Sequence, residues 1–460
     1  MKKYTKWINL FTLLFLLSSC SKSEFLEMKP TTTIITPTTL SDFQYLLDNT
    51  NIQGTSALAQ LADDDYFLAN EADLANKSIT EQNSYIWAKD IYGGTKEIPD
   101  WNIPFKNIFY SNAVLEGLVK SDSNSSERGQ FLKGWALFNR AYFMYDLTRN
   151  FCKSYDESTA TTDLGIPIRL KSGIDKLEKR ASLQKTFDQI ISDLTSAENL
   201  LPKTRNSSNL NRPSRIAVYA LLARIYLEMR SYVQAEIYAD KCLNLYSKLI
   251  DYNTLSLTAS RPFSITNEEL IYNTATVPNY ELTSAYSLSP AKVVNSLVQS
   301  YDINDLRKTI FFLLNQTNGY YTKKSGYYGL GSYPFSGLAT DEIYLIKAEC
   351  LVRNGMPNLA MDKLNELLIT RYSNKSVFIP LRASSNAHAL DIILQERRKE
   401  LVFRGQRWHD LKRLNKEGAQ ITISRTLLGT RYTLPSNDPR WVFPIPDDEV
   451  TLSGIAQNQR

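Results

Sequence analysis

The chain has 460 residues, of which 43% are hydrophobic, with 53 Lys and Arg against 48 Asp and Glu and an unusually large number of tyrosines, 27. This length allows a large buried core and, taken alone, suggests two or three domains. The ordinary apolar content, modest Gly and Pro and balanced charge exclude collagen-like, low-complexity, disordered and polytopic membrane proteins, and they argue against nucleic-acid binding.

The first 20 residues have the layout of a bacterial export signal. Lysines at positions 2, 3 and 6 precede an apolar run, residues 8–17, that is too short to span a bilayer. The run ends in Leu-Ser-Ser-Cys20, which is typical of a lipobox, in which the cysteine is lipidated and becomes the new N-terminus; the alternative is an ordinary secretory signal with an incidental cysteine. We therefore expect a signal peptide at residues 1–19 and a lipidated Cys20 with a tether over residues 20–40.

Cleavage of the signal also changes the charge of the protein. It removes three lysines and no acid, so the formal net charge falls from +5 to +2. A mature surface this close to neutrality favours neutral cargo over polyanions. Cys152, Cys242 and Cys350 then remain, and we expect buried thiols rather than disulfides.

The remaining chain carries a helical periodicity with recurring hairpin signatures. Apolar residues at 3.6-residue spacing predict helices over residues 131–145, 183–201 and 390–401. A hairpin over residues 216–246 sets bulky side chains against small ones, a spacing typical of tetratricopeptide repeats. A second hairpin over residues 344–367 has Gly355 as a helix stop and Pro357 as a helix start.

Two stretches between the hairpins lack any period. They span residues 254–289 and 315–338 and are rich in Tyr, Ser, Gly and Thr. We predict long loops with short strands there. Long structured loops on a helical scaffold often carry function.

Catalytic and metal-binding motifs are largely missing. The sequence has no His-Glu-x-x-His, Gly-x-Ser-x-Gly, phosphate-binding loop or Cys-x-x-Cys pair. The acidic run 63–65 could bind a hard cation, but it lacks the spacing of a Ca²⁺ loop, so we expect a helix or loop end. His409 is expected to have a structural or surface role, and the basic run 396–400 to form ion pairs along a helix. We expect no cofactor and no metal, although a structural Ca²⁺ is possible.

Several segments resemble the SusD/RagB-type outer-membrane lipoproteins of Bacteroidetes. The most specific is residues 396–411, ERRKELVFRGQRWHDL, which is similar to the family's Glu-Arg-Arg-x-Glu-Leu, Gly-x-Arg-Trp and Asp-Leu segment. The others are the lipobox, LGIP at 164–167, the helix at 215–227, EIYL at 342–345, and FPIP at 443–446 followed by Gln-Asn at 457–458. They occur in the family's order along nearly the whole chain.

The resemblance implies a mainly α fold. We expect a single SusD-like scaffold of about four scattered tetratricopeptide-like hairpins with long irregular loops and a few short β-strands. Residues 41–250 would form an N-terminal half and residues 251–460 a C-terminal half of one compact unit.

The resemblance also implies a function. The protein would be anchored in the outer membrane through Cys20, exposed at the cell surface, and would bind a glycan or oligosaccharide and deliver it to a SusC-like TonB-dependent transporter, without catalysis and without nucleic acid. Two alternatives are a tetratricopeptide-like protein-interaction adaptor and a binder of peptide or glycopeptide cargo. A glycan-cleaving enzyme also stays open, because carboxylate pairs are brought together only by the fold.

The candidate ligand contacts come from the residues alone, because the family's contacts lie in variable loops. Aromatic rings outside the helical stripes can stack on the C–H face of a sugar, whereas the competing interpretation is that they pack beneath loops. The residues that we select are Trp87, Tyr92, Tyr327, Tyr328 and Tyr333.

Overall fold

A computed structural model describes residues 37–460, apart from 51–52, 174–176, 286–288, 330 and 428. The predicted signal peptide, the lipidation site Cys20 and most of the predicted tether lie outside the described residues. Residues 39–460 form one compact unit.

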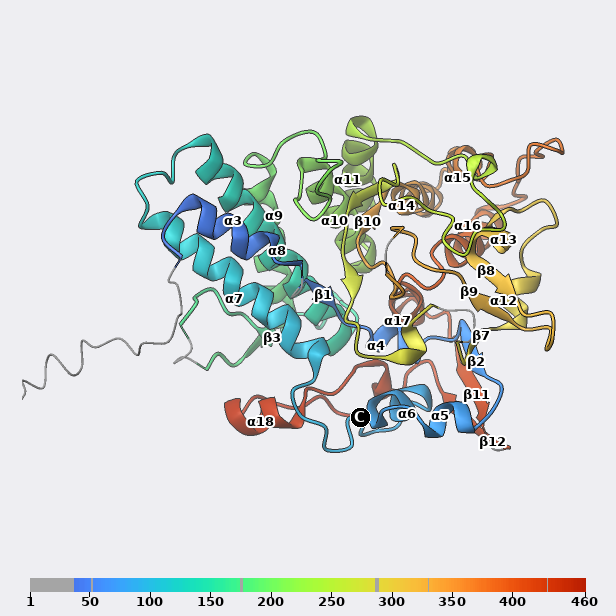
Figure 1. The fold of residues 1–460 in the computed structure, drawn as a ribbon, viewed down its shortest axis with the longest axis horizontal. Coiled ribbons are helices and arrows are strands. Elements are labelled where there is room, and N and C mark those ends of the chain that lie inside the picture. The colour runs from blue at the N-terminus through green and yellow to red at the C-terminus, as the bar shows by residue number, and fades with distance from the viewer. Residues whose placement is uncertain (1–36, 51–52, 174–176, 286–288, 330, 428) are drawn as a thin grey trace, which may run out of the picture. The chain divides into compact units, whose positions relative to one another are not determined.

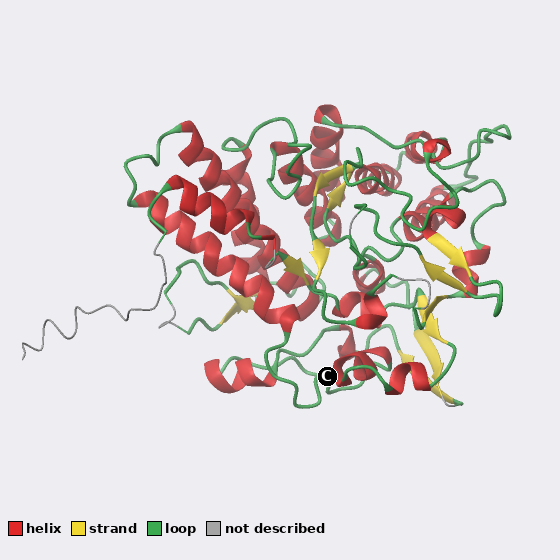
Figure 2. Ribbon diagram, viewed as in Figure 1, coloured by secondary structure: helices red, strands yellow, loops and turns green. Residues whose placement is uncertain are grey.

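The described part of this unit is mainly helical, as predicted (Figures 1 and 2). The α-helices are α3 (Leu40–Asp48), α4 (Leu58–Ala62), α5 (Ala72–Ala75), α6 (Ile79–Tyr85), α7 (Pro99–Val119), α8 (Glu127–Phe151), α9 (Leu183–Glu198), α10 (Arg215–Glu228), α11 (Tyr232–Leu245), α12 (Asn295–Gln299), α13 (Arg307–Phe311), α14 (Thr340–Arg353), α15 (Pro357–Leu368), α16 (Asn386–Glu400), α17 (Arg407–Lys416) and α18 (Asp447–Ser453). Short 3₁₀ turns are η3 (Tyr252–Thr254), η4 (Glu281–Thr283) and η5 (Pro439–Trp441).

The strands are short and form separate two-stranded ribbons scattered over the helical scaffold (Figure 2). They are β1 (Gly54–Thr55), β2 (Tyr66–Leu68), β3 (Leu164–Pro167), β4 (Arg180–Ser182), β5 (Leu270–Tyr272), β6 (Ala275–Thr276), β7 (Ala291–Val293), β8 (Phe312–Leu314), β9 (Tyr321–Lys323), β10 (Leu338–Ala339), β11 (Ile423–Leu427) and β12 (Thr430–Leu434). The pair β1–β6 is parallel, and the pairs β2–β7, β3–β4, β5–β10, β8–β9 and β11–β12 are antiparallel. The ribbons β1–β6, β2–β7 and β5–β10 join segments that are distant in sequence, whereas β3–β4, β8–β9 and β11–β12 join neighbouring strands, and none of them extends into a larger sheet.

Helix α8 is the most deeply buried long helix of the N-terminal part. The Ser126 side chain accepts a hydrogen bond from the Gly129 amide at 3.0 Å, which caps its first turn. Every residue from Gly134 to Phe151 is buried, because α7 and α9 pack along it and later segments cover the rest. The helix predicted over residues 131–145 is confirmed and is longer at both ends.

The two predicted hairpins are also present. In α10–α11, the small side chains of Ala235 and Ala239 are fully buried, and Tyr226 stacks on Tyr238 with ring centroids 5.5 Å apart. Between α14 and α15, Gly355 has a positive φ of 80°, a conformation that glycine adopts without strain, and Pro357 occupies the first turn of α15. The spacing of bulky and small residues therefore predicted the helices, and Gly355 and Pro357 predicted the turn between α14 and α15.

Contacts of Arg180 and Asn458 connect the C-terminal segment with β4 and the end of α8. The Arg180 guanidinium donates to the Asn458 Oδ1 atom at 2.8 Å and to the Ala456 carbonyl at 3.0 Å. The Asn458 amide in turn donates to the carbonyls of Phe151 and Phe443, each at 2.8 Å. The end of α8 is thus fixed by residues about 300 positions later.

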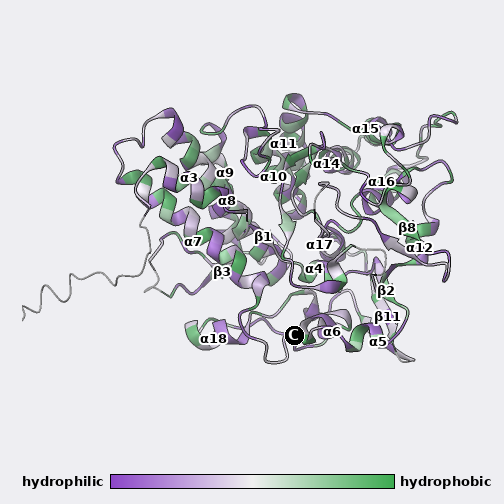
Figure 3. Ribbon diagram, in the orientation of Figure 1, coloured by the Kyte–Doolittle hydropathy of each residue, from purple (hydrophilic) through white to green (hydrophobic). Residues whose placement is uncertain are grey.

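Hydrophilic and hydrophobic residues alternate along the helices, as Figure 3 shows by colour. In the part of the chain that the structure describes, no helix combines the length and the apolar character needed to cross a membrane.

The expectations for cysteines and for the acidic run are confirmed. Cys152, Cys242 and Cys350 are buried free thiols. Asp63 ends helix α4, and Asp64 pairs with Arg407 at 2.7 Å, so the acidic run is a helix end with ion pairs.

The expectation for the basic run 396–400 is only partly right. Lys399 pairs with Glu396 one turn away, at 2.6 Å. Arg397 and Arg398, however, pair with carboxylates outside the helix, Asp410 and Asp65, because this end of α16 is enclosed by other segments.

His409 is buried in α17 and is surrounded by cations. Burial, and then the nearby charges of Arg149, Lys412 and Arg224, hold the pKa of His409 well below its usual value near 6.5. The folded protein therefore keeps this ring neutral, whereas the unfolded chain takes up a proton below pH 6.5. The contribution of the neutral His409 ring to the free energy of unfolding is therefore fully present above pH 6.5 and is lost as the pH falls below it.

We expect the His409→Gln variant to have a flatter pH dependence of stability than the wild type between pH 6.5 and 5. The wild-type contribution of His409 has a slope of at most about 1.4 kcal/mol per pH unit. Denaturant unfolding at several pH values measures it. His388, the second histidine of the chain, is exposed, so His388→Gln is the matched control and should keep the wild-type slope. Equal slopes for all three proteins would contradict the prediction.

Candidate functional site

A cleft lies where β9 and the following loop meet the end of α16. We call it the β9 cleft; it is lined by parts of residues 323–335 and 400–404 together with Phe263 and Phe311. It encloses about 50 Å³. A water molecule needs about 10–15 Å³ by such a measure, so the cleft has room for about four waters. It can take one substituent of a ligand while the rest of the ligand remains at its mouth.

Backbone hydrogen bonds fix the walls of the cleft. The β8–β9 register places Lys323 opposite Phe312. On either side of Tyr333, the Ser332 carbonyl accepts from the Ala285 amide at 2.6 Å, and the Pro334 carbonyl accepts from the Thr276 amide at 3.0 Å. The Tyr333 ring, which is half-buried, is therefore carried on a backbone that is held at both neighbouring positions.

A glycine allows the loop between β9 and Tyr333 to fold closely. Gly329 has a φ of +72°, and a Cβ atom there would lie 2.4 Å from the backbone of residues 264 and 265. A larger residue would strain the loop and push it away from Phe263.

The floor of the cleft is an aromatic cluster. Tyr327 packs on Phe263 with ring centroids 4.9 Å apart and on Phe335 at 5.5 Å. The Arg404 guanidinium lies 4.2 Å from the centroid of the Tyr327 ring, and Phe311 stacks on Phe263 at 6.3 Å. Offset aromatic contacts and cation–π contacts stabilise such a cluster in addition to the stabilisation that comes from burying its apolar surface.

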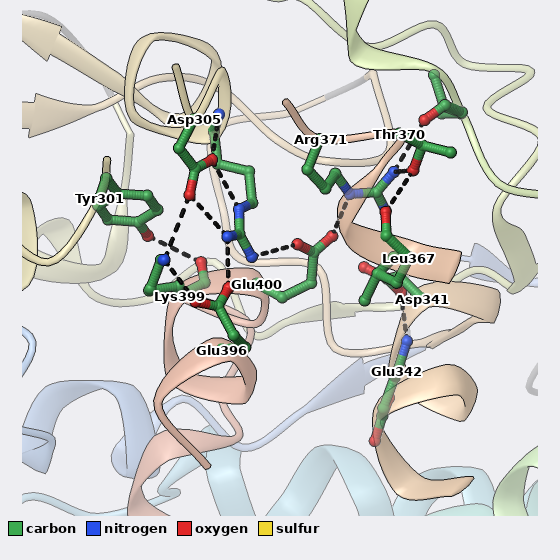
Figure 4. A network of polar contacts seen from close by, with 12 residues as sticks. Tyr301, Asp305, Asp341, Glu342, Leu367, Thr370, Arg371, Glu396, Lys399 and Glu400 are labelled. Atoms are coloured by element: carbon green, nitrogen blue, oxygen red, sulfur yellow. Dashed lines mark hydrogen bonds and ion pairs between the residues drawn. The ribbon is translucent and has the colours of Figure 1, made fainter. Parts of the chain in front are cut away.

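A buried polar network adjoins this floor, and Figure 4 shows the part of it around Glu400 and Arg371. Glu400 accepts from Arg307 at 3.0 Å and from Arg371 at 2.8 Å, and Arg371 also binds Glu269 at 2.7 Å. The Tyr327 hydroxyl donates to Glu269, so the network reaches the floor of the cleft directly. Burial raises the pKa of Glu269 to about 7, because the attraction of Arg371 only partly offsets desolvation.

Three of the selected aromatic residues lie at or beside this cleft. Tyr327 and Tyr333 line it, Tyr327 as a nearly buried floor and Tyr333 as the more accessible ring. Tyr328 is half-buried against Phe335, with centroids 6.1 Å apart, but does not line the cleft. Tyr333 is therefore the best-placed ring for stacking on a ligand.

The selection of Trp87 and Tyr92 as accessible rings is wrong. Their exposures are 2% and 1%. The Trp87 Nε1 atom donates to the Ala62 carbonyl at 2.9 Å, and Arg425 covers the ring at 5.0 Å; the Tyr92 hydroxyl donates to the Pro444 carbonyl at 2.7 Å. Segments that are distant in sequence accept the hydrogen bonds of both side chains and cover both rings. Neither ring therefore has a face that a ligand could reach.

Several lining residues were missed from the sequence. Lys323 and Lys324 line the cleft. They come shortly after the tyrosines 320–321 in an aperiodic stretch, and this position could have identified them as candidate ligand contacts. Arg404 lies in the segment 396–411 that carries the family resemblance; it pairs with the buried Asp341 and also lines the cleft. Phe263 carried no signal that distinguishes it from an ordinary core phenylalanine.

Within the described ranges, no group of three or more His, Cys, Asp or Glu side chains is arranged to hold a metal ion. The lining residues of the β9 cleft offer aromatic faces and cationic donors, groups suited to binding a polar ligand by stacking and hydrogen bonds.

Comparisons with known proteins identify relatives of the whole compact unit. A family model described as "Starch-binding associating with outer membrane" matches residues 24–227, and the SusD family model matches residues 261–459. SusD-like protein P2 of Formosa agariphila is 25% identical over 352 residues, which are 65% of this chain and 67% of that protein.

Solved structures have the same fold. A putative sugar-binding protein from Bacteroides vulgatus has a TM-score of 0.72 at 23% identity, over 92% of this chain and 99% of that chain. A SusD superfamily protein from Bacteroides thetaiotaomicron has a TM-score of 0.72 at 20% identity, over 92% and 100%. Surface glycan-binding protein A from Bacteroides fluxus has a TM-score of 0.70 at 17% identity, over 92% and 99%.

Proposed function

Because the chain belongs to the SusD family, we propose that it is a lipid-anchored protein of the outer-membrane surface that binds a glycan or oligosaccharide. It delivers this cargo to a SusC-like TonB-dependent transporter and does not cleave it. Anchoring is through Cys20 in this proposal.

One observation carries the proposal beyond family membership, namely the arrangement of the β9 cleft. Its half-buried Tyr333 ring lines the same cleft as Lys323 and Arg404, which carry hydrogen-bond donors. A ring of this kind can stack on the C–H face of a sugar, and cationic donors can bind its hydroxyls. The description of the matching family as starch-binding and of one structural neighbour as surface glycan-binding agrees with this chemistry.

The test is binding by the purified full chain in mild detergent. Titration calorimetry against a broad oligosaccharide panel should find at least one ligand, and the reducing ends of that ligand should not increase during incubation. Isolation of the protein from native membranes should co-purify a TonB-dependent barrel. Absence of both binding and a barrel would contradict the proposal, whereas new reducing ends would favour a glycan-cleaving enzyme.

The Tyr333→Ala variant should bind that oligosaccharide about 5- to 30-fold more weakly, a loss of about 1–2 kcal/mol, because the stacking ring is removed. Calorimetry measures the change in Kd. Tyr45 on α3 is 74% exposed and does not line the cleft, so Tyr45→Ala is the matched control and should leave Kd unchanged. An unchanged Kd in Tyr333→Ala would remove this ring from the site.

A further inference from the structure

The β9 cleft has a strong imbalance of charge. Lys323, Lys324 and Arg404 line it, whereas Glu400 is the one acid among its described lining residues. Both oxygens of Glu400 are occupied, by Arg307 at 3.0 Å and Arg371 at 2.8 Å. Glu400 therefore has little capacity to neutralise the cations of the cleft.

Those cations keep donor capacity that the described residues do not use fully. The ammonium group of Lys323 donates to the Thr283 carbonyl, and that of Lys324 donates to the Leu257 carbonyl at 2.7 Å, so both meet neutral acceptors. Arg404 pairs with Asp341 through Nη1, while its buried Nη2 atom has no hydrogen-bond partner among the described residues. An ammonium has three donors, and a buried donor without a partner is costly.

Resting on the proposed glycan-binding function, we infer that the β9 cleft receives an anionic substituent, a carboxylate or a sulfate, carried by an acidic sugar of the cargo. The volume of the cleft fits such a group better than a whole sugar ring, which would remain at the mouth against Tyr333. Hydrogen bonds from Lys323, Lys324 or Arg404 to such an anion would be charge-assisted, and bonds of this kind are about twice as strong as neutral ones.

The electrostatics of Lys323 agree with this geometry. Burial lowers the pKa of Lys323 to about 7, and the opposing attraction of Asp63 is smaller. An anion placed in the cleft would favour the charged form of the lysine and supply the counter-charge that the described lining residues lack. The formal net charge of +2 for the mature chain, which favours neutral cargo, does not describe this local concentration of cations.

Paired oligosaccharides test the inference on the full chain in mild detergent. One pair is a galacturonate trisaccharide and a galactose trisaccharide; the other is a sulfated galactan fragment and the same fragment after desulfation. We expect the acidic member of at least one pair to bind about tenfold or more tightly than its neutral partner. Which pair shows the difference identifies the anion as carboxylate or sulfate.

Charge-removing variants connect this preference with the cleft. Lys323→Gln and Lys324→Gln should each weaken binding of the acidic member several-fold more than binding of the neutral member, so that the preference for the acidic member falls. Lys153→Gln removes the same charge at a side chain that is 70% exposed and lies outside the cleft, so it should keep the full preference. Equal binding of acidic and neutral members, or equal loss for both in Lys323→Gln, overturns this inference alone. No binding of any panel member overturns the proposed function as well.

Discussion

The Arg307→Met variant should unfold with a free energy lower than that of the wild type by about 3–5 kcal/mol, because it removes one partner from a buried ion-pair network. The Arg307 side chain has no solvent exposure and binds Asp305 at 2.7 Å, Glu396 at 2.5 Å and Glu400 at 3.0 Å. Methionine fills much of the same space but leaves these carboxylates short of a counter-charge. Denaturant unfolding followed by circular dichroism measures the loss.

A surface pair provides the control. Lys153 pairs with Asp163 at 2.7 Å, but its side chain is largely exposed, so Lys153→Met should change stability by less than about 1 kcal/mol. If Arg307→Met were as stable as this control, the network in Figure 4 would not hold the C-terminal part together. Because Glu400 and Arg371 connect the network with Tyr327, we also expect Arg307→Met to weaken ligand binding at the β9 cleft.

The Trp408→Ala variant should lose about 3–5 kcal/mol of stability, the usual cost of emptying a large aromatic site in a core. Trp408 is fully buried in α17, with its ring centroid 4.4 Å from that of Trp441 and 5.3 Å from that of Phe443. These contacts join α17 to the segment that follows β12. The same unfolding assay measures the effect.

Val377 offers a control for this variant. It is 89% exposed, so Val377→Ala removes apolar atoms that are not packed and should change stability by no more than about 0.5 kcal/mol. A loss of less than about 1 kcal/mol in Trp408→Ala would mean that neighbouring side chains collapse into the vacated space.

The helical scaffold was predictable because its signal is local. In each of the hairpins α10–α11 and α14–α15, the periodic apolar residues and the small contact residues lie within the hairpin itself. The same is true of the Gly355–Pro357 turn of α14–α15. Hydrophobic periodicity and turn chemistry act over a few residues, so a single sequence contains them in full.

The binding surface was only partly predictable because exposure is decided by distant segments. Trp87 and Tyr333 both lie outside helical stripes, and nothing near either residue distinguishes them. Trp87 is covered by Arg425, more than 300 positions later, whereas Tyr333 remains half-buried at the mouth of the cleft. The sequence also could not show that Arg404 both pairs with Asp341 and covers the Tyr327 ring in the cleft, because these two partners lie far from it in sequence.

The contacts of Arg180 and Asn458 also have a consequence for the order of folding. Since Asn458 binds the Phe151 and Phe443 carbonyls and Arg180 binds Asn458, the N-terminal helices gain these bonds only after almost the entire chain has been synthesised. Pairings of such long sequence separation form slowly. A chain interrupted before residue 456 lacks these contacts, so the end of α8 should be more accessible to proteolysis in a truncated chain than in the full one.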